Sequence, residues 1–132
     1  MPQENVETVR ACLDAWNRGD WDAALVAAAP DVVLDASGIA GEWRGVHRGR
    51  DQVKRQWDSF VEPWKSVRSE VEEYIDAGEH VVARVTGRFL GRDGIEVQTK
   101  TGFCFTFRDG LMTHDLVAND FGEALAAAGL TE

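Results

Sequence analysis

The sequence predicts one α+β domain that spans residues 1–132. Apolar residues recur at helical spacing in the first half of the chain, whereas strand and turn patterns fill the second half. This order is typical of an α+β fold and differs from the strand–helix alternation of a parallel sheet. The chain of 132 residues also has the length of one ordinary domain, and its 44% of hydrophobic residues can form a core.

The N-terminal third of the chain predicts two helices and a strand. Residues 5–18 carry apolar side chains at helical spacing, and Gly19 suits the left-handed position that ends a helix. A short helix over residues 21–29 follows and stops at Pro30, which cannot continue it. Residues 31–36 are rich in β-branched side chains and predict the first strand.

A glycine-rich stretch over residues 37–49 predicts a loop that is long enough to cover a site. Helical spacing returns over residues 50–63. The rest of the chain predicts an antiparallel meander of four strands, separated by turn residues such as Asp109 and Gly110, and then a short helix. The strands are expected over residues 66–76, 80–90, 95–107 and 111–119, and the helix over residues 121–130.

Composition disfavours several classes of partner. The net charge of −9 disfavours nucleic acid and anionic membrane surfaces, which attract basic proteins. No segment reaches the ~20 apolar residues of a membrane helix, and the acidic N-terminus does not resemble a signal peptide, so we expect a cytoplasmic protein. Cys12 and Cys104 lie far apart, and neither the cysteines nor the three histidines have the spacing of metal ligands. We therefore expect no metal and no cofactor.

Six fragments of the sequence resemble one known family. They are, in order, NVETVRACLDAWNRGDWDAAL, PDVVLDASG, RGRDQVKRQW, DAGEHVVARV, FTFRDGLM and EALAAAGL. Together they resemble the SnoaL-like branch of the nuclear-transport-factor-2-like superfamily over essentially the whole chain. The resemblance implies a cone, in which a bent sheet and the N-terminal helices enclose a deep apolar cavity, and a homodimer through the outer face of the sheet. Members include isomerases, polyketide cyclases, epoxide hydrolases, dehydratases and binding proteins, so the fold does not fix a reaction.

Asp35 is the first candidate for chemistry, because it ends the first predicted strand, where the resembling isomerases hold their general base. A carboxylate in an apolar cavity has a raised pKa, which suits proton abstraction next to a carbonyl group. The alternative is that Asp35 only accepts hydrogen bonds from nearby backbone amides. The donors of the isomerases match Cys12 and Phe103 here, and neither is a suitable donor, so steroid isomerisation is not expected.

Arg84 and Asp115 are the second and third candidates. Arg84 matches the active-site arginine of the resembling epoxide hydrolases, but their two carboxylates match Thr86 and Val117, so epoxide hydrolysis is not expected. Asp115 lies within a predicted strand, where aspartate is unfavourable, and shares a strand face with Val117. We expect Asp115 to pair with Arg84 inside the cavity, either for catalysis or as a structural ion pair.

Aromatic and neighbouring side chains are expected to contact a ligand. At helical and strand spacing such residues also form an ordinary core, but in a cone the core and the cavity wall are the same layer. An aromatic wall favours a flat or hydrophobic ligand. The predicted contacts are Trp16, His47, Trp57, Tyr74, Phe105 and Val117, with Trp43 as a further candidate.

Three hypotheses of function follow. In the first, Asp115 or Asp35 acts as the base and Arg84 stabilises an oxyanion, in cofactor-free proton transfer on a hydrophobic carbonyl compound, as in cyclases, isomerases or dehydratases. In the second, the protein only binds a small hydrophobic molecule. In the third, its own side chains fill the cavity and the domain acts through its surface. The volume of the cavity separates the first two hypotheses from the third.

Overall fold

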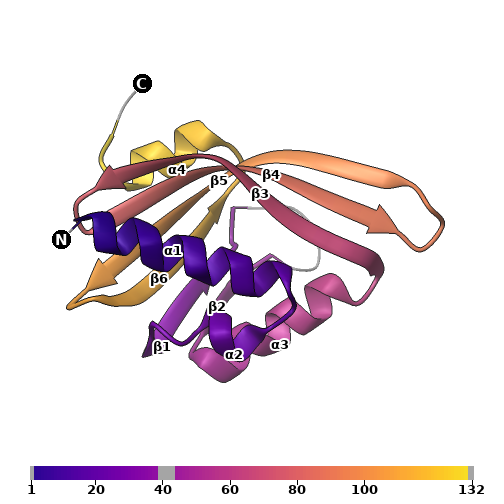
Figure 1. The fold of residues 1–132 in the computed structure, drawn as a ribbon, viewed down its shortest axis with the longest axis horizontal. Helices are drawn as coiled ribbons and strands as arrows, with labels where there is room; N and C mark the ends of the chain where they lie inside the picture. Colours follow the sequence, from indigo (N-terminus) through magenta and orange to yellow (C-terminus); the bar gives the residue numbers. More distant parts are fainter. Residues whose placement is uncertain (1, 39–43, 131–132) are drawn as a thin grey trace.

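The computed structural model describes residues 2–38 and 44–130 and has the α+β fold that the sequence predicts (Figure 1). The helices are α1 (Pro2–Asn17), α2 (Trp21–Ala24), α3 (Arg50–Val61) and α4 (Phe121–Ala127). The strands are β1 (Ala28–Asp35), β2 (Val46–Arg48), β3 (Trp64–Ala77), β4 (His80–Gly91), β5 (Glu96–Arg108) and β6 (Leu111–Ala118). The four predicted strands after residue 63 and the last helix are therefore confirmed, with shifts of a few residues at their ends.

The described strands form a curved mixed sheet in the order β2-β1-β6-β5-β4-β3. Strands β3 to β6 make the predicted antiparallel meander, whereas β1 pairs in parallel with β6. At the turn between β5 and β6, Asp109 and Gly110 both have left-handed backbone angles, with φ of 54° and 80°. These angles are the ones that the Asp-Gly pair predicts for a tight hairpin.

Helices cover both faces of the sheet (Figure 1). On the concave face, α1 packs against β3 and β4, and α3 packs against β1, β2 and β3. On the convex face, α4 packs against β4, β5 and β6. None of the helices in the described part of the chain is long and apolar enough to span a membrane.

The second helix is shorter than predicted. The sequence pattern extends it over residues 21–29, but α2 ends at Ala24 and β1 begins at Ala28. Ala28 pairs with Met112 in β6, and the backbone N–H of Met112 donates a hydrogen bond of 2.9 Å to the carbonyl oxygen of Ala27. Pairing with β6 therefore overrides the local preference of this alanine-rich segment for a helix.

The predicted loop over residues 37–49 contains the short strand β2. This strand pairs antiparallel with the end of β1, where His47 lies opposite Leu34. Trp43, which the sequence offered as a possible ligand contact, lies outside the described residues.

Two apolar layers hold the fold together, one on each side of the sheet. Between the sheet and helices α1 and α3, the side chains with at most 2% exposure include Val9, Val53, Val81, Phe105 and Met112. Under α4, a second buried cluster contains Val82, Cys104, Ala118, Ala124 and Leu125. Because strands β4 and β5 are buried on both faces in this region, it forms a rigid floor for the concave side.

Candidate functional site

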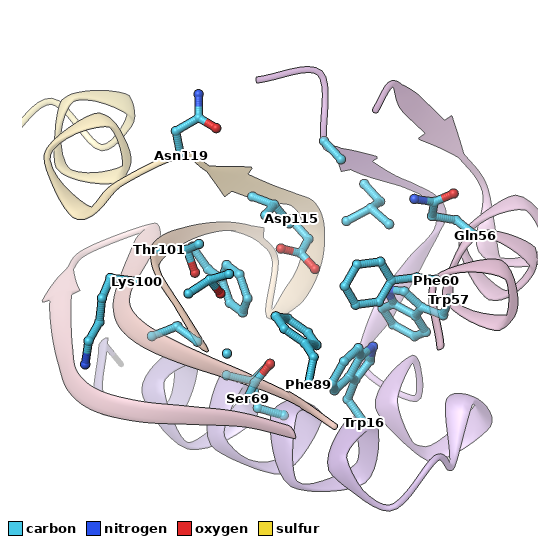
Figure 2. A pocket seen from close by; sticks show the side chains of 18 of the residues that line it. Trp16, Gln56, Trp57, Phe60, Ser69, Phe89, Lys100, Thr101, Asp115 and Asn119 are labelled. Carbon is cyan, nitrogen blue, oxygen red and sulfur yellow. The ribbon is translucent and has the colours of Figure 1, made fainter. Parts of the chain in front are cut away.

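A cavity of about 460 Å³ lies on the concave face of the sheet (Figure 2). Its walls come from helices α1 and α3 and from strands β1, β3, β4, β5 and β6, and most of the wall is apolar. This volume lies within the range of roughly 300–1,000 Å³ that small-molecule sites have. The open volume argues against the hypothesis that side chains fill the cone.

Aromatic rings form a continuous wall along one side of the cavity. Trp16 of α1 and Phe60 of α3 have ring centroids 6.4 Å apart, and Phe60 meets Phe89 of β4 edge-to-face at 5.6 Å. Trp64 of β3 continues the row, with its ring centroid 5.3 Å from that of Phe89. Each ring is held by its neighbours, so the wall offers a fixed surface to a flat or apolar ligand.

Hydrogen bonds fix the C-terminal end of α1 to β3 beside this wall. The side-chain amide of Asn17 donates to the carbonyl oxygen of Ser69 at 2.9 Å, and the N–H of Ser69 donates to Asn17 Oδ1 at 2.8 Å. Ser69 lines the cavity, and Trp16 precedes Asn17 directly. The reciprocal pair therefore fixes the position of Trp16 relative to the sheet.

Asp115 places a carboxyl group in this apolar surrounding. It lies on β6, opposite Phe105 of β5 and beside Leu34 of β1, and its side chain points into the cavity (Figure 2). Its Oδ1 atom is buried and has no hydrogen-bond partner among the described residues. Burial raises the pKa of Asp115 from 3.8 to about 7, because an apolar environment disfavours the charged form. Both protonation states are therefore populated near neutral pH.

Two cysteines near Asp115 stay uncharged, Cys12 on the cavity side of the sheet and Cys104 on the opposite face, under α4. Cys12 of α1 lines the cavity, and burial, followed by the nearby charge of Asp115, raises its pKa well above the usual range for a thiol. The same two causes raise the pKa of Cys104 to about 11. Neutral thiols are poor nucleophiles and poor metal ligands. Within residues 2–38 and 44–130, no group of three or more His, Cys, Asp or Glu side chains is arranged to hold a metal ion.

The predicted pairing of Arg84 with Asp115 is wrong, because the two side chains lie on opposite faces of the sheet. The guanidinium of Arg84 lies 4.1 Å from the ring centroid of Phe121 in α4, and its Nε lies 3.5 Å from Glu73 Oε1. The next residue, Val85, lines the cavity instead. Since successive residues of a strand point to opposite faces, Arg84 belongs to the convex surface.

Asp35 also lies outside the cavity, although the sequence predicts it as a general base there. Its neighbours Leu34 and Ala36 line the wall, whereas Asp35 accepts hydrogen bonds from the hydroxyl of Ser37 at 2.6 Å and from its N–H at 3.0 Å. The bond from the Ser37 hydroxyl is the main reason why the pKa of Asp35 lies below its usual value. Asp35 therefore fits the alternative expectation, in which the carboxylate only accepts hydrogen bonds from nearby groups.

The predicted ligand contacts divide into two groups. The cavity wall contains Trp16, Trp57 and Val117. Phe105 is fully buried in the core, and the half-buried ring of Tyr74 packs under the guanidinium of Arg10 at 4.7 Å. His47 lies on β2 outside the lining residues, and its Nε2 is buried without a hydrogen-bond partner in the described part of the chain.

Several aromatic residues of the wall were not predicted as ligand contacts. They are Phe60, Trp64, Phe89 and Phe103. Two signals in the sequence point to Phe60 and Phe103. Phe60 follows Trp57 by three residues and so shares its helix face, and Phe103 precedes Phe105 by two residues and so shares its strand face.

Comparison with protein families identifies the chain. A family model described as the SnoaL-like domain matches residues 9–114. The chain belongs to the SnoaL-like family. This result confirms the family that the six sequence fragments predict. A comparison with curated proteins finds no match.

Solved structures share the fold of this SnoaL-like chain. TerC, co-crystallised with polyporic acid, is 21% identical with a TM-score of 0.80, over 96% of this chain and 97% of that chain. An NTF2-like protein of unknown function from Burkholderia pseudomallei is 24% identical with a TM-score of 0.74, over 93% and 95%. A putative polyketide cyclase from Xanthomonas campestris pv. campestris is 23% identical with a TM-score of 0.73, over 96% and 97%. At these identities the likeness concerns the fold, which is NTF2-like.

Proposed function

We propose that this SnoaL-like protein binds a small hydrophobic carbonyl compound and that Asp115 transfers a proton on it without a cofactor. The observation that carries the proposal is the buried carboxyl oxygen of Asp115, which has no hydrogen-bond partner among the described residues. Leaving a buried polar group without a partner costs free energy, and a ligand that supplies a partner removes this cost.

The protonation state of Asp115 suits this role. A pKa of about 7 lets the carboxylate take a proton at neutral pH and give it back. In the proposed step, the carboxylate removes a proton from the carbon next to the carbonyl group. The C–H bond breaks, and its electron pair moves to give an enolate. The Asp115 acid then returns the proton to another carbon, which isomerises the compound. Alternatively, the enolate carbon attacks a second carbonyl carbon, which closes a ring by a new C–C bond. The electron pair of that C=O bond moves to its oxygen, and the resulting alkoxide takes the proton from Asp115.

Neutral donors are the available partners for the enolate oxygen. Lys100 contributes to the wall, but its ammonium group binds Glu72 Oε1 and Thr86 Oγ1, both at 2.8 Å, and points away from the cavity in Figure 2. The hydroxyl of Thr101 and the buried N–H of Trp64, which has no hydrogen-bond partner within residues 2–38 and 44–130, belong to residues of the wall. Such donors stabilise an oxyanion in a dry site, although less than a cation does.

Hydrogen–deuterium exchange tests the proposal. Flat cyclic ketones are incubated with the protein in D₂O, and exchange at the carbon next to the carbonyl is followed by NMR. We expect exchange above the uncatalysed rate, and a loss of about 10²–10⁴-fold in Asp115→Asn, since this is the contribution of a general base. Asp35→Asn removes a carboxylate outside the cavity and serves as the matched control. Equal rates in wild type and Asp115→Asn would contradict the proposal.

A second candidate function is binding without catalysis. It is favoured by the lack of an inward-pointing cationic side chain among the described wall residues, because an enolate gains most from such a group. A thermal-shift measurement with the same ketones separates the two functions, since a ligand that binds only the folded state raises the melting temperature. A rise without deuterium exchange would assign the cavity to binding alone.

A further inference from the structure

We propose that the same cavity binds an organic ammonium ion, with its positive charge against Asp115 and its apolar substituents against the aromatic wall. This inference goes beyond the proposed proton transfer, although both depend on the same carboxyl group. It concerns the charge of the ligand rather than a reaction.

Asp115 has no positively charged partner in the described part of the chain. Its side chain points into the cavity, and its Oδ1 is buried without a hydrogen-bond partner among the described residues. The sequence predicts Arg84 as a neutraliser, but Arg84 lies on the convex face, where it contacts Glu73 and Phe121. Lys100 is bound to Glu72 on that same face. A cationic ligand would pair with the Asp115 carboxylate, whereas an anionic ligand would be repelled by it.

The wall around Asp115 also suits a cation. The carboxyl group of Asp115 points into the space that Phe60 and Phe89 border in Figure 2, and Trp57 and Trp16 extend the aromatic surface from there. The face of an aromatic ring carries partial negative charge and attracts cations, most strongly when water is excluded. A carboxylate within an aromatic wall combines the two groups that recognise alkylammonium ions. The apolar rings also bury the carbon substituents on the nitrogen.

Binding of an ammonium ion at Asp115 should depend on pH. An ammonium ion pairs with the carboxylate form of Asp115, so binding competes with the proton that this residue holds below a pH of about 7. Two titratable groups interact with its charge, Cys12 on the cavity side and Cys104 on the opposite face of β5, and burial raises the pKa of both. His114, the neighbour of Asp115 on β6, is exposed on the other face. The affinity for a permanently charged ammonium is therefore expected to fall about tenfold for each pH unit below 7.

Isothermal titration calorimetry with two isosteric probes tests the inference. Benzyltrimethylammonium carries a fixed charge, and neopentylbenzene has the same shape without the charge. At pH 8 we expect the cation to bind at least about tenfold more tightly than the neutral probe, and Asp115→Asn to remove this preference. Phenylacetate, an anionic probe, is expected not to bind. Asp35→Asn, which removes a carboxylate from the other side of β1, is expected to retain the preference for the cation.

The outcomes separate this inference from the proposed function. Equal affinities for the two probes, or an unchanged cation affinity in Asp115→Asn, would overturn the ammonium site. Binding of neopentylbenzene by Asp115→Asn shows that the variant is folded and its cavity intact. Deuterium exchange on ketones without a preference for the cation would support the proton transfer and reject the ammonium site. A preference for the cation without any deuterium exchange would support the ammonium site and reject the proton transfer.

Discussion

The two faces of the sheet differ in whether their charged side chains have partners. On the convex face, Arg88 contacts Glu70 through Nε at 2.5 Å and Glu96 through Nη1 at 3.3 Å, and charged side chains beside it are paired in the same manner. On the concave face, aromatic and aliphatic side chains surround Asp115, whose Oδ1 has no partner among the described residues. Both faces belong to the same strands, because β4 and β5 alternate between them.

This difference shows which polar residues are structural. On the convex face, the charged side chains described above are exposed and paired with opposite charges, so they say little about function. On the concave face, burial of a carboxyl group costs free energy, and no hydrogen bond from the described residues to Asp115 Oδ1 offsets this cost. Such a group is a better candidate for ligand recognition than any of the paired charges.

The largest effect is expected from the core beneath the cavity. Phe105 is fully buried, and its ring meets that of Phe103 edge-to-face at 6.0 Å. Phe105→Ala should lower the free energy of unfolding by about 3–5 kcal/mol, the range for such a truncation in a core. Phe103→Ala should cost less, because part of its side chain already borders the open cavity. Urea denaturation measures the free energy of unfolding of both variants, and equal losses would contradict the deeper burial of Phe105.

The pH dependence of stability comes next. The folded state raises the pKa of Asp115 from 3.8 to about 7, so it binds this proton more tightly than the unfolded state does. The free energy of unfolding should therefore fall as the pH rises from about 4 to about 7. At about 1.4 kcal/mol per pKa unit, the decrease is at most roughly 4 kcal/mol. Asp115→Asn should lack this contribution.

Asp35 provides the matched control for this titration, with the opposite sign. Its pKa is lowered in the folded state, chiefly by the Ser37 hydroxyl, so its contribution is present above the unfolded pKa and is lost as the pH falls. Above pH 4 Asp35→Asn should therefore keep the wild-type pH profile, whereas Asp115→Asn should lose the decrease between about pH 4 and 7. Urea denaturation of the two variants and wild type between pH 4 and 8 measures both profiles. If Asp115→Asn keeps the wild-type pH profile, the carboxyl group is not desolvated.

The sequence predicts the order of the elements better than it predicts the faces of the strands. Turn residues and alternating apolar positions define β3 to β6, because these signals are local. Whether a residue faces the cavity depends on register across the sheet, which is not local. Arg84 pairs with Gly102 of β5, whereas Asp115 pairs with Phe105, three positions further along the same strand. An odd number of positions puts the two side chains on opposite faces.

The same limit applies to the rest of the site. Helical spacing predicts Trp16 and Trp57 on the buried sides of their helices, because the apolar stripe of a helix marks that side directly. The strand face predicted for Asp35 is wrong, since its neighbours Leu34 and Ala36 line the cavity. The missing hydrogen-bond partner of Asp115 has no signature in the sequence, because it depends on every element that surrounds the cavity.

A smaller effect is expected where α4 meets the convex face. A Cβ atom on Gly102 would lie 2.8 Å from Ala124 Cβ and 2.9 Å from Phe121 Cα, closer than normal contacts allow. Gly102→Ala should therefore displace α4 and lower the free energy of unfolding by about 1–3 kcal/mol, as overpacking does. Gly38→Ala, where a Cβ meets no atom within 4 Å, is the matched control for thermal denaturation. A stable Gly102→Ala variant would indicate looser packing of α4.

The smallest effect is expected from the paired charges of the convex face. Arg88→Gln removes the charge that contacts Glu70 and Glu96, but both acids are well exposed and water can replace the contact. The variant should melt slightly below wild type at low salt, and the difference should shrink as salt screens the pairs. It should leave deuterium exchange and ammonium binding unchanged, because its side chain belongs to the face opposite Asp115. A loss of either activity without a loss of stability would show that the two faces are coupled, and the carboxyl group would then no longer account for the site by itself.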